Sequence, residues 1–236
     1  MLHRSRRFAC VLVVLPATLL LSDCGRKHQA TRALPSAPSL GSGETGLASW
    51  YGHPYHGRAA ANGEIYDMEK LTAAHRTLPF GTWVRVTNLT NDKSVEVRII
   101  DRGPFVSGRI IDLSHAAAEV IDMVGSGIAR VRLDIVSAPA VASAENWYAV
   151  QAGAFREKDR AESLRVSMER EYGSARLVFR GGSVALWRVL VGREPTEDAA
   201  DVLAQRVRQE AGAAFVVRLD ETVGDIHRSA RPTGAR

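Results

Sequence analysis

Cysteine is almost absent from the chain. The 236 residues contain two, Cys10 and Cys24, and both lie in the first 24 residues. The rest of the chain therefore offers no thiol for a disulfide framework and no cysteine cluster for a structural zinc site. Any metal site would have to rely on histidine and carboxylate ligands.

A charge excess of one sign is also missing from the middle of the chain. The formal net charge is +5, but residues 1–27 carry five basic residues against one aspartate, and residues 221–236 carry three arginines against two acidic residues. These end segments account for the whole excess. A nucleic-acid-binding domain would show a basic patch on its folded part. The distribution therefore argues against nucleic acid as a partner.

The chain lacks an apolar run suited to a permanent membrane span. Residues 3–7 (HRSRR) are basic and residues 8–21 are mostly apolar, which predicts an export signal over residues 1–24. The segment 21–24 (LSDC) resembles a bacterial lipoprotein box, in which Cys24 becomes lipidated, although Asp23 stands where that pattern has a small residue. The alternatives are a lipid-anchored protein and an ordinary cleavage site beside an incidental thiol.

The remaining length allows two small domains separated by linkers. Residues 25–45 are rich in Ala, Ser, Pro and Gly without an apolar period, which predicts a flexible linker. A second linker is predicted at 138–145 and a disordered tail at 221–236. The predicted domains are therefore residues 46–137 and 146–220.

The first domain alternates between short apolar strands and turns. Strands are predicted at 82–88, 94–100, 109–113 and 128–136, where apolar residues occupy every second position. Ser114 can cap a short helix over 115–123. Several short strands with one helix in about ninety residues favour a small β-barrel over an open sheet.

The second domain contains an internal repeat with an offset of 39 residues. Each half reads as a strand followed by an amphipathic helix, and a further strand follows each helix, which predicts β-α-β-β-α-β. Such a four-stranded sheet with two helices on one face leaves the other face available for binding. The repeated positions are Tyr148, Val150, Gly153, Ala161, Leu164 and Met168, matched by Trp187, Val189, Gly192, Ala200, Leu203 and Val207.

Asp101 is the first candidate for chemistry. It follows the predicted strand 94–100 and precedes a Gly-Pro turn at 103–104. A partly desolvated carboxylate at a strand end can have its pKa raised into a range useful for acid or base catalysis. The local sequence alone favours the alternative that Asp101 pairs with Arg102, Arg109 or a turn amide.

Glu64 and His75 are weaker candidates by themselves. Glu64 follows Asn62-Gly63 and fits a turn, and His75 lies among small and apolar residues, as structural histidines do. With Asp101 they give three potential ligands without a cysteine or a second histidine in metal spacing. The sequence therefore predicts no metal site.

The first domain resembles the double-psi β-barrel of the rare lipoprotein A (septal-ring lytic transglycosylase) family, over residues 46–136. The second resembles a SPOR domain, over residues 146–220. The segments that carry the first resemblance are 48–52 (ASWYG), 61–67 (ANGEIYD), 71–82 (LTAAHRTLPFGT), 86–89 (VTNL), 101–105 (DRGPF) and 109–114 (RIIDLS), and those that carry the second are 147–155 (WYAVQAGAF) and 187–192 (WRVLVG).

The barrel resemblance implies a lytic transglycosylase, with six strands in the barrel and no cofactor. Such an enzyme cleaves the bond between N-acetylmuramic acid and N-acetylglucosamine without water, and the muramoyl C6 hydroxyl closes on C1 to leave a 1,6-anhydro end. The family's functional positions fall on Asp101, expected as acid and then base, and on Glu64 and His75. Further expected sugar contacts in the barrel are Trp50, Tyr51, Asn62 and Arg102.

The SPOR resemblance implies binding of glycan strands stripped of their stem peptides at division sites. Gln151 and Trp187 are the expected contacts on the open sheet face. The implied location is the cell envelope, with lipid anchoring in the outer membrane and enrichment at the septum, where septal division proteins are possible partners.

Two departures from the barrel family's pattern keep a second reading open. Ile100 stands where the family has Asn, and Ala60 stands where it has Thr. Loss of an amide and a hydroxyl near Asp101 would remove hydrogen bonds that orient it. The alternative is a non-catalytic, expansin-like peptidoglycan-binding lipoprotein, and a groove lined by both Glu64 and Asp101 would favour the enzyme.

Overall fold

A computed structural model describes residues 43–139, 146–180 and 185–219 of the chain. The predicted signal peptide with Cys24, most of the first linker, most of the second and the predicted tail lie outside the described residues. Within the described part, no helix has the length and apolar character needed to cross a membrane.

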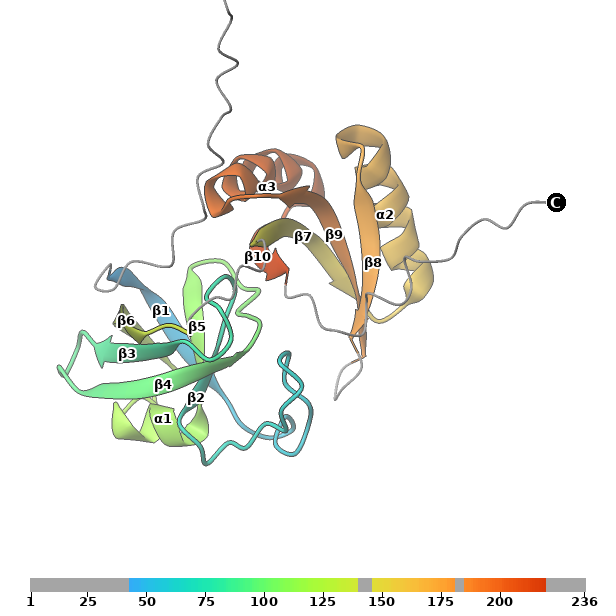
Figure 1. Ribbon diagram of the computed structural model, residues 1–236. Helices are drawn as coiled ribbons and strands as arrows, with labels where there is room; N and C mark the ends of the chain where they lie inside the picture. The colour runs from blue at the N-terminus through green and yellow to red at the C-terminus, as the bar shows by residue number, and fades with distance from the viewer. Residues whose placement is uncertain (1–42, 140–145, 181–184, 220–236) are drawn as a thin grey trace, which may run out of the picture. The chain divides into compact units, whose positions relative to one another are not determined.

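The first domain is a closed six-stranded barrel with strand order β1-β5-β2-β4-β3-β6 (Figure 1). β1 pairs with β5 and β2 with β4 in parallel, and the other neighbouring pairs are antiparallel. The architecture confirms the predicted barrel. Its strands are β1 (Glu44–Tyr51), β2 (Thr72–His75), β3 (Trp83–Asn88), β4 (Ser94–Asp101), β5 (Arg109–Ser114) and β6 (Ile128–Ser137).

The barrel core follows from the alternation of apolar and polar residues along these strands. Val84 and Val86 of β3 and Val97 and Ile99 of β4 are fully buried, whereas the residues between them are not. Each strand thus presents one apolar face to the interior, as a closed sheet requires.

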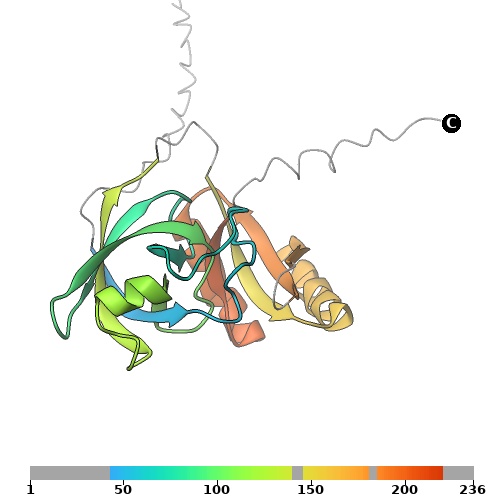
Figure 2. The same ribbon diagram turned by 90° about the horizontal axis from the view of Figure 1, so that it is seen from below.

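A short helix, α1 (His115–Val120), packs on the barrel beside β1 (Figure 2). The Ser114 hydroxyl accepts from the N–H of Ala117 at 3.3 Å, which confirms the predicted cap. The helix ends earlier than predicted, because Ile121 leaves helical geometry and Asp122 adopts a φ of 58°.

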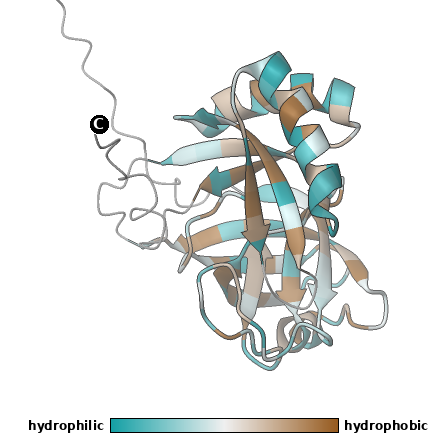
Figure 3. Ribbon diagram, turned by 90° about the vertical axis from the view of Figure 1, so that its right-hand side faces the viewer, coloured by the Kyte–Doolittle hydropathy of each residue, from teal (hydrophilic) through white to brown (hydrophobic). Residues whose placement is uncertain are grey.

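The second domain is a four-stranded antiparallel sheet of order β10-β7-β9-β8. Both helices pack on one face, where Val150, Val189 and Val191 form the core with helix residues. Hydrophobic and hydrophilic residues alternate along these elements (Figure 3). The elements are β7 (Trp147–Phe155), α2 (Lys158–Tyr172), β8 (Ala175–Arg180), β9 (Leu186–Glu194), α3 (Glu197–Ala211) and β10 (Phe215–Leu219).

Two glycine–leucine contacts explain why the same residue types recur in the two halves of the second domain. A Cβ atom added at Gly153 would come within 2.9 Å of Leu164 Cδ2, and one added at Gly192 would come within 2.5 Å of Leu203 Cδ2. In each half, a glycine in the strand makes room for a leucine of the following helix. The repeat therefore preserves one strand-to-helix contact twice.

Substitution of Gly192 tests this packing. Gly192 has a φ of 73° and lies against Leu203, so Gly192→Ala introduces both backbone strain and overlap. We expect the calorimetric Tm of the second domain to fall by at least about 5 °C. Gly125→Ala is the control, because no atom lies within 4 Å of its added Cβ and its φ is not positive. Equal Tm values for the two variants would contradict the packing explanation.

Candidate active site

Four residues lie opposite one another in four adjacent barrel strands. Ser49 of β1 pairs with Asp112 of β5, Asp112 pairs with Ala74 of β2, and Ala74 pairs with Asp101 at the end of β4. Directly paired residues share a face of the sheet. We call this set the outer row, because the residues that alternate with it are buried in the barrel core: Ala48, Ala73, Ile111 and Leu113. Two carboxylates thus flank the methyl group of Ala74.

Asp101 is held by backbone donors. Its Oδ1 accepts from the N–H of Ala61 at 2.9 Å and from the N–H of Arg102 at 2.7 Å. Burial raises the pKa of Asp101 above its ordinary value, although these two N–H groups oppose the shift. A partly buried carboxyl with a raised pKa and a fixed orientation suits proton donation.

The two departures from the family pattern lie in one small apolar cluster. Ala60 and Ile100 are both buried and pack with Tyr66, and the Tyr51 ring lies against them. The N–H of Asn62 also donates to the Ile100 carbonyl at 3.1 Å. Because backbone amides orient Asp101, its position does not depend on polar side chains at residues 60 and 100.

Glu64 forms an ion pair with Arg98. Its two carboxylate oxygens accept from the guanidinium of Arg98, each at 2.7 Å, and Asn62 Nδ2 donates to it at 2.8 Å. The hydrogen bond from Arg98 holds the pKa of Glu64 below its ordinary value. Glu64 is therefore ionised and is not a proton donor. The Asn62 side chain also stabilises the turn that carries Glu64, because its Oδ1 accepts a hydrogen bond from the N–H of Glu64.

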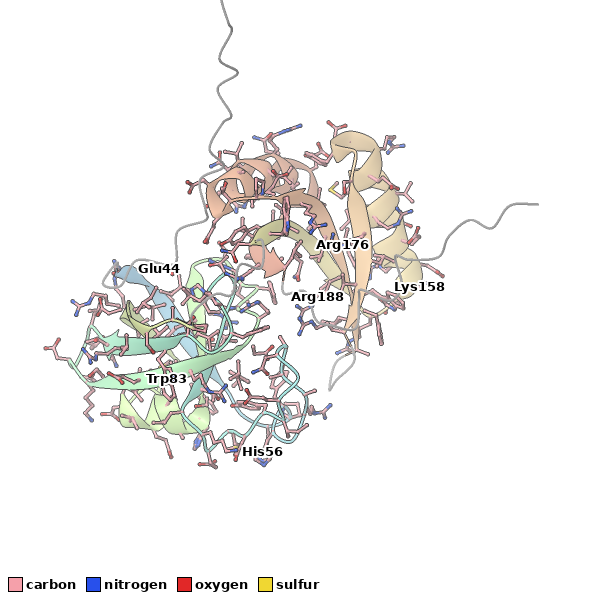
Figure 4. The ribbon with its side chains drawn as sticks, in the orientation of Figure 1. Glu44, His56, Trp83, Lys158, Arg176 and Arg188 are labelled. Atoms are coloured by element: carbon pink, nitrogen blue, oxygen red, sulfur yellow. The ribbon has the colours of Figure 1, made fainter. Side chains whose placement is uncertain are left out.

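His75 stabilises a turn at the end of β2. Its buried Nδ1 accepts from the N–H groups of Thr77 and Leu78, at 3.2 and 3.1 Å. These acceptor bonds place the ring proton on Nε2, which donates to Glu44 Oε2 at 3.2 Å. Figure 4 shows Glu44 near the start of β1. Since His75 follows Ala74 in the strand, its side chain projects to the opposite face from the outer row.

Arg102 is buried within the barrel rather than presented to a ligand. Its guanidinium lies 3.7 Å from the centre of the Phe80 ring, and Nη1 donates to the His75 carbonyl at 3.1 Å. These contacts give Arg102 a role in fixing the turn after β4, and its sugar contact stays a prediction.

The aromatic residues at the end of β1 face different surroundings. Trp50 packs against the barrel core and lies edge-on to His115. Tyr51 stacks on Tyr66, with ring centres 4.3 Å apart. Burial, reinforced by the charge of Asp101, raises the pKa of Tyr51, so its hydroxyl stays protonated. Trp50 is partly buried against the core, whereas Tyr51 contributes to the surroundings of Asp101.

Asp112 and Ser49 were not singled out from the sequence. The Ser49 hydroxyl donates to Asp112 Oδ1, and burial raises the pKa of Asp112. A carboxylate between the apolar residues Ile111 and Leu113 was the available signal. The neighbours of Asp112 depend on the pairing of β5 with both β1 and β2. This pairing joins segments that are distant in the sequence.

One group among the described residues has potential metal ligands close together: Glu69, His115 and Glu119, with donor atoms within 4.8 Å of one another. Nδ1 of His115 faces Glu69 at 3.7 Å, whereas Nε2 faces Glu119 at 3.8 Å. A single ion can take only one of these nitrogens. Both glutamates are also exposed, so the arrangement is better explained as two weak surface contacts of the His115 ring.

In the second domain, the structure separates the two predicted glycan contacts. Gln151 pairs with Leu190 and Phe215 on the sheet face away from the helices. Trp187 packs with the helix-side core, and Lys158 of α2 lies 5.1 Å from its ring centre. The prediction that placed Trp187 on the open sheet face is wrong, because strand alternation turns it toward the helices.

Comparison with known proteins identifies relatives of both domains. Residues 43–133 match the family model described as "Lytic transglycolase", and residues 144–218 match the SPOR domain model. The endolytic peptidoglycan transglycosylase RlpA of Helicobacter pylori strain J99 is 39% identical over 200 residues, covering 72% of this chain and 63% of the relative. That of Campylobacter jejuni is 53% identical over 102 residues, covering 43% of this chain and 37% of the relative.

The chain thus spans less than two thirds of the length of these curated relatives. Among solved structures, the peptidoglycan binding domain of the B. subtilis cell wall lytic enzyme CwlC is 32% identical. That match covers 33% of this chain and 95% of the other, with a TM-score of 0.27.

Replacement of His75 tests its structural role. His75→Phe leaves the N–H groups of Thr77 and Leu78 without their acceptor, so we expect the free energy of unfolding to fall by about 1–3 kcal/mol. His75→Asn retains an acceptor close to the Nδ1 position and should lose less. Urea unfolding measures both variants. A His75→Phe protein within about 0.5 kcal/mol of the wild type would argue against this role.

Proposed function

We propose that the chain is an endolytic peptidoglycan transglycosylase of the RlpA type, because its barrel matches the lytic-transglycolase model, its second domain matches the SPOR model, and similar proteins carry that name. Its substrate is the bond between N-acetylmuramic acid and N-acetylglucosamine, and its products carry 1,6-anhydro ends. Glycan strands without stem peptides are the preferred substrate.

The observation that carries this proposal is the state of Asp101. Burial raises its pKa, and two backbone N–H groups fix one of its oxygens. A general acid at neutral pH needs a raised pKa, and it must also be oriented toward the atom that receives the proton. The binding-only alternative gives no reason for a carboxyl with both properties on the outside of the barrel.

Asp101 serves first as acid and then as base. In its protonated form it gives a proton to the leaving glycosidic oxygen as the bond to C1 breaks. The resulting carboxylate takes the proton of the muramoyl C6 hydroxyl as that oxygen bonds to C1. Asp101 is thus protonated again at the end of the cycle, and no water is consumed.

Glu64 and His75 support Asp101 as positioning residues. The Glu64–Arg98 ion pair and the turn at Asn62 hold the loop whose Ala61 N–H binds Asp101. The His75 carbonyl accepts from the guanidinium of Arg102, the residue after Asp101. Glu64 thus acts through the loop that contacts Asp101, and the backbone of His75 lies against the turn that follows Asp101.

The SPOR domain brings the barrel to its substrate. Its sheet face away from the helices, which carries Gln151, is the proposed surface for stem-peptide-free glycan. Accumulation of such glycan at the division septum would concentrate the protein there. Export, acylation of Cys24 and anchoring in the outer membrane complete this proposed location in the cell envelope, beside septal division proteins.

Mass spectrometry of naked glycan strands tests the activity. We expect the chain without its first 27 residues to produce fragments with 1,6-anhydro ends, and Asp101→Asn to reduce the rate by at least about 1,000-fold because it removes the only proton donor in the proposed cycle. Asp122→Asn, an exposed aspartate paired with Lys93, is the matched control and should retain full activity.

The possible results separate the two classes of function. Anhydro ends from the wild type and the control, but not from Asp101→Asn, would support the transglycosylase. Strands that are bound but stay intact with the wild type would refute it and leave a non-catalytic peptidoglycan binder.

A further inference from the structure

Trp83 differs from the other tryptophans of the chain. Trp50, Trp147 and Trp187 each lie against a histidine ring or a cation, whereas among the described residues no ring or cation lies against Trp83. Trp83 is also 39% exposed, at the start of β3 (Figure 4). An exposed aromatic ring without such a partner is a candidate binding position on a protein surface.

A bulge in β4 puts Trp83 and Asp101 on the same side of the barrel. Trp83 pairs with Arg98, so these two side chains share a face of the sheet. Between Arg98 and Asp101 the pairing of β4 with β2 shifts by one residue, because Ile100 has no partner in β2. Without this extra residue, strand alternation would turn Asp101 to the opposite face from Arg98. The bulge therefore leaves all three side chains on the outer face.

Hydrogen bonds connect Arg98 to the surroundings of Asp101. The Arg98 guanidinium donates to both carboxylate oxygens of Glu64 at 2.7 Å. The loop that carries Glu64 also supplies the Ala61 N–H that binds Asp101 at 2.9 Å. Arg98 and Asp101 are roughly 10 Å apart along β4, and Trp83 lies one strand to the side of Arg98. A ligand that reaches both Trp83 and Asp101 must therefore be longer than one sugar ring.

The polar groups beside Trp83 suit a sugar. Glu64 Oε1 accepts from both Arg98 and Asn62, whereas Oε2 accepts from Arg98 alone among the described residues. A carboxylate oxygen can accept two hydrogen bonds, so Oε2 can take another from a sugar hydroxyl or an acetamido N–H. An aromatic ring for the apolar face of a pyranose, with a polar group that fixes its orientation, is a combination suited to sugar binding.

We propose that Trp83 forms a remote glycan subsite with the Glu64–Arg98 ion pair, and that this subsite binds a sugar at least one unit away from the bond cleaved at Asp101. The inference rests on the proposed function and adds to it a preference for long strands. The occupant is the glycan strand, because the subsite is connected to Asp101 through the Glu64 loop and only a strand extends so far from the cleaved bond. Binding energy from this remote unit is lost with short fragments.

Cleavage of strands of two lengths tests the subsite. The substrates are naked glycan fragments of about four sugars and strands of about twelve sugars or more, cleaved by the chain without its first 27 residues. We expect Trp83→Ala to lower kcat/KM by at least about 10-fold for the long strands and by less than about 2-fold for the short fragments. Trp83→Phe keeps a ring and should stay within about 3-fold of the wild type on both substrates.

Leu89→Ala is the matched control for the loss of an exposed apolar side chain. Leu89 directly follows β3, at the other end from Trp83, and is 40% exposed. Its replacement should leave kcat/KM unchanged for both lengths of glycan.

A fluorine NMR signal reports binding at Trp83 without cleavage. The Asp101→Asn chain is labelled with fluorotryptophan, and the additional substitution Trp83→Phe assigns the Trp83 signal. Long naked strands should shift this signal, whereas free stem peptides should leave it in place. This readout does not depend on activity.

The outcomes separate the inference from the proposed function. If the wild type yields no anhydro ends, the proposed function fails, and the NMR titration alone decides whether Trp83 binds glycan. If the wild type is active, a Trp83→Ala protein that cleaves long strands within about 2-fold of the wild type, or loses equally on both lengths, refutes the subsite alone. If Trp83→Ala does not fold, a Trp83 signal shifted by long strands supports the proposal. A signal that stays in place, or shifts only with stem peptides, refutes it.

Discussion

The pairing of the short strand β2 with both β4 and β5 is the constraint on which the site depends. β2 lies parallel to β4 and antiparallel to β5, so Ala74 is opposite Asp101 on one side and Asp112 on the other. Because side chains alternate across a sheet, a shift of one residue in β2 would bring His75 into the outer row and turn Ala74 toward the interior. The hydrogen bonds of His75 to the following turn oppose such a shift. The histidine thus acts on the site through the register of its strand.

Backbone groups, more than side chains, orient Asp101. The N–H groups of Ala61 and Arg102 hold Asp101, and the loop that supplies Ala61 is closed by the Glu64–Arg98 ion pair. This explains how the chain can carry Ala60 and Ile100 in place of the Thr and Asn usual in the family. Both residues contribute to one apolar cluster below the site. The substitutions are complementary, since each apolar side chain has the other as a neighbour.

The sequence predicted the architecture because its signals are local. Alternating apolar residues located most barrel strands, and the repeat of 39 residues located both halves of the second domain. The individual site residues were harder to predict, because their roles depend on pairing between distant strands. Asp112 gains Ser49 and Ala74 as neighbours through the pairing of β5 with β1 and β2. Trp187 was assigned to the wrong sheet face, since its alternation places it with Val189 on the helix side. Glu64 and His75 were identified through the family resemblance, and the contacts that explain them are visible only in the fold.

The account depends most directly on the protonation of Asp101. A carbon-13 NMR titration of the aspartate carboxyl groups, with Asp101→Asn to assign the signal, measures this property in the chain without its first 27 residues. The account predicts a pKa for Asp101 above the ordinary value of 3.8, because burial outweighs the two backbone donors. A measured pKa at or below 3.8 would contradict the assignment of Asp101 as the proton donor. The barrel would then hold a permanently charged carboxylate, which suits binding rather than acid catalysis.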